Sequence, residues 1–168
     1  MRAPLIFLSS IVLLACGAPL GRGYSGSTTC ASGQSWSGGT SESELMQPGV
    51  ACRACHLTTE PGKAYFFMGT AYASSHQADL CASDSTLTGA VVEILDTNDV
   101  VQLTLPINAA GNFRSLKTTA DVPVPYKARV KAGGKISAMA AAQTSGDCNS
   151  CHTAAGAEGA PGRVLSPQ

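Results

Sequence analysis

The stretch Gly89–Asp96, GAVVEILD, alternates between two kinds of position. Successive side chains of an extended chain point to opposite faces, so Val92 and Ile94 share one face. The odd-numbered residues, which include Glu93, share the other. This period of two, bounded by turn-forming residues, is typical of a β-strand with one face packed on a core. It predicts a sheet in the middle of the chain.

Similar patterns recur on both sides of this stretch, at Tyr65–Ala73, Val100–Pro106, Tyr126–Ala132 and Lys135–Met139. Turn residues separate the strands in DTND, AAGN and AGGK, at residues 96–99, 109–112 and 132–135. About six or seven short strands at this spacing predict a mainly β protein. We expect an antiparallel β-sandwich over residues 64–140, flanked by irregular segments with little helix.

Part of this region resembles a known scaffold. Gly89–Ile94 fits the pattern G-x-x-V-x-[IL], and Gly111–Phe113 fits a following G-x-F turn. Over Thr88–Met139 the chain is similar to the carboxypeptidase regulatory-like, immunoglobulin-type sandwich domains. The resemblance implies a scaffold and no particular chemistry, because such folds host many functions.

The N-terminus predicts export. Met1 and Arg2 precede an apolar run, Leu5–Leu14, that is too short to span a membrane as a mature helix. Leu13–Cys16, LLAC, resembles the lipobox of bacterial lipoproteins, which implies that Cys16 is lipidated; a plain secretory signal is the alternative. We expect an exported lipoprotein, anchored to a membrane in the periplasm or on the cell surface.

Two pentapeptides dominate the chemistry: CRACH at Cys52–His56 and CNSCH at Cys148–His152. Two thiols three positions apart suit thioether bonds to the two vinyl groups on one side of a haem, and the next residue, a histidine, can bind the iron. The motifs resemble those of c-type cytochromes, which implies two covalently attached haem c groups. Alternatives are a thioredoxin-like redox pair, a zinc site and ordinary disulfides.

On the haem reading, the thioether residues are Cys52, Cys55, Cys148 and Cys151, and the proximal iron ligands are His56 and His152. The chain has three histidines, so His76 is the one left as a distal ligand, and at most one iron can have two histidines. Met46 and Met139, which precede the two motifs, are the other distal candidates. Packing of the methionines and a solvated His76 are the simpler alternatives.

The remaining cysteines are Cys30 and Cys81, and in an oxidising compartment we expect them to form a disulfide. The chain then divides into a signal peptide (1–15), a Gly/Ser/Thr-rich tether (16–40), a first haem segment (41–63), the sandwich (64–140) and a second haem segment with a C-terminal loop (141–168). Arg163, in that loop, is expected at the surface, with approach to a haem propionate as the alternative.

This layout resembles secreted bacterial dihaem lipoproteins. It predicts an electron carrier between redox proteins of the cell envelope rather than an enzyme. The alternatives are a surface binding or structural module rigidified by haem, and a haem-based ligand sensor. The net charge is zero and 13% of residues are charged, so we expect no nucleic-acid partner. The basic stripe Lys127–Lys131 is either a solvated face or a docking site for an acidic redox partner.

Overall fold

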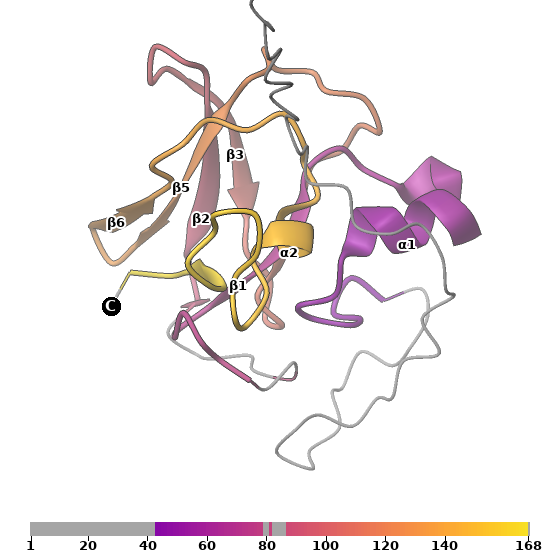
Figure 1. The fold of residues 1–168 in the computed structure, drawn as a ribbon, viewed down its shortest axis with the longest axis horizontal. Helices are drawn as coiled ribbons and strands as arrows, with labels where there is room; N and C mark the ends of the chain where they lie inside the picture. Colours follow the sequence, from indigo (N-terminus) through magenta and orange to yellow (C-terminus); the bar gives the residue numbers. More distant parts are fainter. Residues whose placement is uncertain (1–42, 79–80, 82–86, 168) are drawn as a thin grey trace, which may run out of the picture.

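The structure is a computed structural model that describes residues 43–78, 81 and 87–167 (Figure 1). The predicted signal peptide, the tether, Cys16 and Cys30 lie outside the described residues. The predictions of lipidation at Cys16 and of a disulfide at Cys30 therefore stay predictions.

The described part of the chain contains two β-sheets. The four-stranded sheet has the strand order β3-β2-β5-β6, and the three-stranded sheet has the order β4-β1-β7. The strands of the four-stranded sheet are β2 (Val91–Leu95), β3 (Val101–Pro106), β5 (Lys127–Ala132) and β6 (Lys135–Ala138). Those of the three-stranded sheet are β1 (Met68–Tyr72), β4 (Asn112–Arg114) and β7 (Val164–Leu165). All pairs are antiparallel except β1 with β7. The prediction of a mainly β fold is confirmed.

In the described residues, helix is limited to short pieces: α1 (Cys52–Thr59), the 3₁₀ turn η1 (Pro61–Lys63) and α2 (Cys148–Cys151). Both α-helices coincide with the cysteine motifs. Figure 1 shows α1 and α2 together on one side of the four-stranded sheet.

The period of two in the sequence determines which face of the four-stranded sheet is buried. Val92 of β2 pairs with Val130 of β5, and both are buried, as is Ile94. The core continues to Phe67 and Tyr126, whose ring centroids lie 4.8 Å apart. Burial of these apolar side chains is the main stabilising term for the fold.

The opposite face of this sheet carries the basic stripe, which is paired with acidic groups. Glu93 is only 7% exposed and binds Arg129 at 2.6 Å and Lys131 at 3.0 Å. Lys127 binds Asp99 at 2.9 Å. Much of the charge of the stripe is therefore neutralised within its own sheet.

Strand β1 is hydrogen-bonded along both edges. Backbone groups of successive residues in a strand point to opposite edges, and β4 occupies one of them. On the other edge, the N–H of Met68 donates to the carbonyl of Gly146 at 3.0 Å, and the N–H of Ser166 donates to the carbonyl of Tyr72 at 2.8 Å. Residues 148–163, which contain the second motif, thus leave and rejoin one edge of β1. The C-terminal segment, expected as an irregular loop, contributes β7 to this sheet.

Candidate functional site

The helical form of the first motif places its reactive groups on one face. In an α-helix, positions i, i+3 and i+4 lie one above the other, so Cys52, Cys55 and His56 share a face of α1. In the second motif Cys148 and Cys151 have the same i, i+3 relation in α2. Each motif therefore presents two sulfur atoms on one side, as attachment of a single ring requires.

The fold brings the two motifs together. The N–H of Ala54, inside the first motif, donates to Oδ2 of Asp147, the residue before Cys148, at 2.8 Å. The side-chain amide of Asn149, inside the second motif, donates to the carbonyl of Val50 at 2.9 Å. The two helices therefore meet near their N-terminal ends, although they lie far apart in sequence.

A buried polar network fixes this junction on β1. Thr70 Oγ1 donates to Asn112 Oδ1 at 2.7 Å and accepts from the N–H of Gly49 at 2.8 Å and from Asn149 Nδ2 at 3.1 Å. Asn149 Oδ1 also accepts from the N–H of Thr70 at 3.0 Å. The asparagine side chain thus occupies the edge of β1 between the points where residues 148–163 leave and return. Fully paired networks of this kind fix one arrangement of their parts.

Glycine at position 69 allows the close contact between α2 and the sheet. A Cβ atom built on Gly69 would lie 2.5 Å from Phe113 Cζ and 2.9 Å from Cys148 Cβ, closer than such atoms pack. The absence of a side chain at this position lets Cys148 lie directly against β1.

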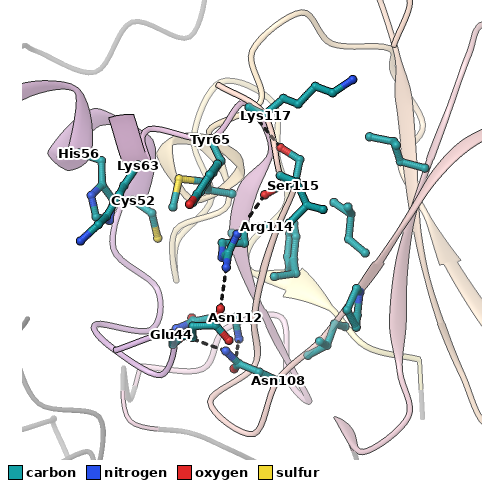
Figure 2. A pocket seen from close by; sticks show the side chains of 18 of the residues that line it. Glu44, Cys52, His56, Lys63, Tyr65, Asn108, Asn112, Arg114, Ser115 and Lys117 are labelled. Atoms are coloured by element: carbon teal, nitrogen blue, oxygen red, sulfur yellow. Dashed lines mark hydrogen bonds and ion pairs between the residues drawn. The ribbon is translucent and has the colours of Figure 1, made fainter. Parts of the chain in front are cut away.

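A cavity of about 670 Å³ lies beside the first motif. Cys52 and His56 line it from α1, together with Met46 from the preceding segment and Met68 from β1. Figure 2 shows Cys52 and His56 on the side formed by α1, with Arg114 of β4 across from them. The volume is in the range of cavities that bind cofactors and other small molecules.

Charged side chains surround this cavity in ion pairs. Arg114 binds Glu44 and lies over the ring of Tyr65, with 4.5 Å between its guanidinium carbon and the ring centroid. Lys63 and Lys117 also line the cavity. Lys63 forms an ion pair with Glu60 at 3.2 Å, and Lys117 forms one with Asp121 at 3.2 Å. The lining of the cavity therefore contains three cations and three carboxylates, paired with one another.

The two motif histidines have different surroundings. His56 Nδ1 is buried, has no hydrogen bond among the described residues, and lies 3.8 Å from a carboxylate oxygen of Glu60. Burial lowers the pKa of His56, and the Glu60 charge opposes this effect. His152 Nδ1, in contrast, is hydrogen-bonded to the carbonyl of Gly162 at 2.8 Å. A neutral imidazole is the form that binds a metal ion.

The thiols differ as well. Cys52, Cys55 and Cys148 are free, whereas Cys81 and Cys151 are disulfide-bonded and do not titrate. Burial raises the pKa of Cys52 and of Cys148 to about 12, and the nearby Asp147 carboxylate adds to the effect. These two thiols are therefore protonated at neutral pH.

Of the predicted distal ligands, the structure brings two near the motifs. Met46 lines the cavity together with His56, and His76 Nδ1 is hydrogen-bonded to the carbonyl of Ala154, just after the second motif. Met139 is half-buried against the hydrophobic core, and its N–H donates to the carbonyl of Ala128 at 2.9 Å. Packing accounts for the position of Met139.

Two residues of the site were not predicted from the sequence. Met68, which lies in the predicted strand Tyr65–Ala73, lines the cavity. Asp147 is 8% exposed, and burial raises the pKa of its carboxyl, opposed by hydrogen bonds from the backbone of Ala54 and Arg53. Because its partner is distant in sequence, no local signal could identify it.

Arg163 was expected at the surface, and this was wrong. It is 6% exposed, with its guanidinium carbon 4.8 Å from the ring centroid of Tyr72. Its Nε donates to the carbonyl of Gln77 at 3.1 Å, and Nη1 lies 3.5 Å from the carbonyl of Gly49. Arg163 thus connects the segment after the second motif to the segment before the first.

In the part of the chain that the structure describes, no three His, Cys, Asp or Glu side chains are grouped as a metal site would require. In the same residues, no helix has the length and apolar character needed to cross a membrane. Comparison with protein-family models, with curated proteins and with solved structures gives no match.

Proposed function

We propose that this protein is an exported dihaem c-type cytochrome that carries electrons between redox partners at the cell envelope. The observation that supports this best is the junction of two Cys-x-x-Cys-His helices through Asp147 and Ala54. A single such motif is a weak signal, but here two motifs lie side by side in one fold. Proximity of two redox groups is what transfer of an electron between them requires.

The residues of the first motif fit the group as they stand, and those of the second fit it once Cys151 is in its thiol form. Cys52, Cys55 and His56 would hold the first haem beside the 670 Å³ cavity, which Cys52 and His56 line. Cys148, Cys151 and His152 would hold the second. Bound haem supplies reversible one-electron chemistry at iron.

The chain's own residues would tune the two sites differently. The Gly162 carbonyl fixes the proton of His152 on Nδ1 and leaves Nε2 able to bind. A carboxylate oxygen of Glu60 lies 3.8 Å from His56 Nδ1, and a carboxylate increases the basicity of a ligating imidazole more than a carbonyl does. We therefore expect the two sites to have unequal reduction potentials. Attachment at the second motif also requires the thiol form of Cys151, which is disulfide-bonded in this structure.

The test is to count covalent haems on protein matured in a host that attaches haem c, by intact mass and pyridine haemochrome spectrum. We expect two haems on the unaltered chain, one on Cys52→Ala/Cys55→Ala and one on Cys148→Ala/Cys151→Ala. The control Gly62→Ala alters an exposed position outside both motifs and should keep two haems. A chain with no covalent haem would overturn the proposal.

Membrane attachment is tested separately. Cys16→Ser should release the protein from the membrane fraction without changing the haem count. Retention of the variant in the membrane fraction would contradict a lipid anchor at this residue.

A further inference from the structure

His76 and His152 are anchored to the same loop, residues 153–163, by matching hydrogen bonds. His76 Nδ1 lies 2.9 Å from the carbonyl oxygen of Ala154, and His152 Nδ1 lies 2.8 Å from that of Gly162. A carbonyl oxygen can only accept, so each Nδ1 must carry the proton and each Nε2 keeps its lone pair. This is the tautomer of a histidine that binds a metal ion through Nε2.

Gly162 keeps the two histidine segments close. Its carbonyl accepts from His152, while a Cβ atom built on it would collide with the carbonyl oxygen of Ser75 and lie 3.3 Å from Cε1 of His76. The next residue strengthens the contact, because the N–H of Arg163 donates to the carbonyl of Ser75 at 2.7 Å. Any side chain at Gly162 would push His76 away from the second motif.

His76 is also accessible to a ligand. Its side chain is exposed, and among the described residues the one hydrogen bond of its ring is the bond at Nδ1. The carbonyl of Ala154 thus orients an imidazole whose other nitrogen remains available.

We infer that His76 is the distal ligand of the iron held by His152. The inference rests on the proposed function, since it requires haem at the second motif and therefore the thiol form of Cys151, which is disulfide-bonded in this structure. Because the chain has three histidines, it also leaves the first iron without a second imidazole. The first iron then has the thioethers of Met46 and Met68 in its cavity as ligands, or an open position.

The experiment uses two single-haem backgrounds: Cys52→Ala/Cys55→Ala, which keeps the second motif, and Cys148→Ala/Cys151→Ala, which keeps the first. His76→Ala is placed in each, and the ferric spin state is read by electron paramagnetic resonance and CO binding by absorption of the reduced protein. In the second-motif background we expect a low-spin iron that does not bind CO. The added substitution His76→Ala should convert it to a high-spin iron that binds CO. In the first-motif background His76→Ala should change neither reading.

Two controls separate loss of a ligand from loss of the fold. Added imidazole should return the His76→Ala protein to the low-spin state, which a misfolded site would not do. Gln77→Ala, which alters the adjacent residue but retains its backbone carbonyl, should leave the spin state unchanged.

The inference is overturned if the second-motif protein stays low-spin and does not bind CO after His76→Ala, or if the change occurs in the first-motif background instead. Failure of the proposed function looks different, because no haem would then be covalently attached to either background.

Discussion

Oδ2 of Asp147 accepts a hydrogen bond from the backbone N–H of Ala54 at 2.8 Å, across 93 residues of sequence. Asp147 directly precedes the second motif, and Ala54 lies between the two cysteines of the first. The N–H groups in the first turn of a helix have no partner within it, and a carboxylate there also interacts favourably with the helix dipole. The second motif thus caps the helix of the first.

Removal of this cap should destabilise the protein. We expect Asp147→Ala to lower the free energy of unfolding by about 1–2 kcal/mol, because it leaves the N–H of Ala54 unpaired in a buried place. Asp147→Asn, which keeps an acceptor oxygen, should recover most of this loss. Denaturant unfolding monitored by circular dichroism measures the change.

The matched control is Asp121→Ala, which removes a carboxylate from an ion pair with the exposed Lys117. Exposed pairs contribute less than about 1 kcal/mol, so this variant should unfold nearly as the unaltered protein does. Equal effects of Asp147→Ala and Asp121→Ala would contradict the capping role.

The contact between α2 and β1 should not tolerate a methyl group at position 69. Gly69→Ala would place its Cβ against Phe113 and Cys148, and we expect it to cost about 1–3 kcal/mol through overpacking. Gly62→Ala is the control, because no atom lies within 4 Å of a Cβ built there. If thermal unfolding shifts equally in the two variants, close packing at Gly69 is not the cause.

The pH dependence of stability should include a contribution from Glu93. Burial raises its pKa, but the hydrogen bonds from Arg129 and Lys131 outweigh burial, and the net pKa lies below the usual value of 4.5. A carboxyl whose pKa is lower in the folded state stabilises the protein above its unfolded pKa, and this contribution is lost as pH falls through the folded pKa. Glu93→Gln should therefore be less stable than the unaltered protein above pH 4.5, with a difference that shrinks in acid.

Melting temperatures between pH 3 and 7 test this expectation. Asp99→Asn, which removes the exposed partner of Lys127, should change stability by less than about 1 kcal/mol throughout. A difference between Glu93→Gln and the unaltered protein that grows as pH falls would have the wrong sign.

The buried thiols should resist alkylation in haem-free protein. With a pKa of about 12, only about one in ten thousand of the Cys52 or Cys148 thiols is ionised to thiolate at pH 8. In an unfolded chain, where the pKa of cysteine is near 8.5, about a quarter of the thiols are ionised at this pH. We expect iodoacetamide to modify both residues at least about 100-fold more slowly in the native state than in denaturant, as followed by peptide mass spectrometry. Similar rates in both states would show that the thiols are not shielded.

Part of the sheet could be predicted from the sequence because strands such as β5 are half-buried. In β5 the buried Ala128 and Val130 alternate with more exposed residues, and this leaves a period of two that is visible without any partner. The AGGK turn was also predictable, because Gly133 and Gly134 both adopt positive φ, at 54° and 79°, between β5 and β6. Local chemistry was enough for these elements.

The arrangement of the site could not be predicted in the same way. The two-residue strand β7 lies in a Gly- and Pro-rich stretch, and it exists because β1 offers it an open edge. The burial of Arg163 depends on Tyr72, Gln77 and Gly49, all distant in sequence. Such positions follow from long-range pairing, for which a single sequence carries no periodic signal.

The route of residues 148–163 has a consequence for how this protein can change over evolution. The segment leaves β1 at Met68 and returns at Tyr72, and the side chain of Asn149 occupies the edge between these points. The ends of the segment are thus fixed on one strand, while the entropy of closing a loop grows only slowly with its length. Insertions or deletions between residues 154 and 161 would leave the register of the sheet intact. The loop after the second motif can in this sense be lengthened or shortened without rebuilding the sheet that carries it.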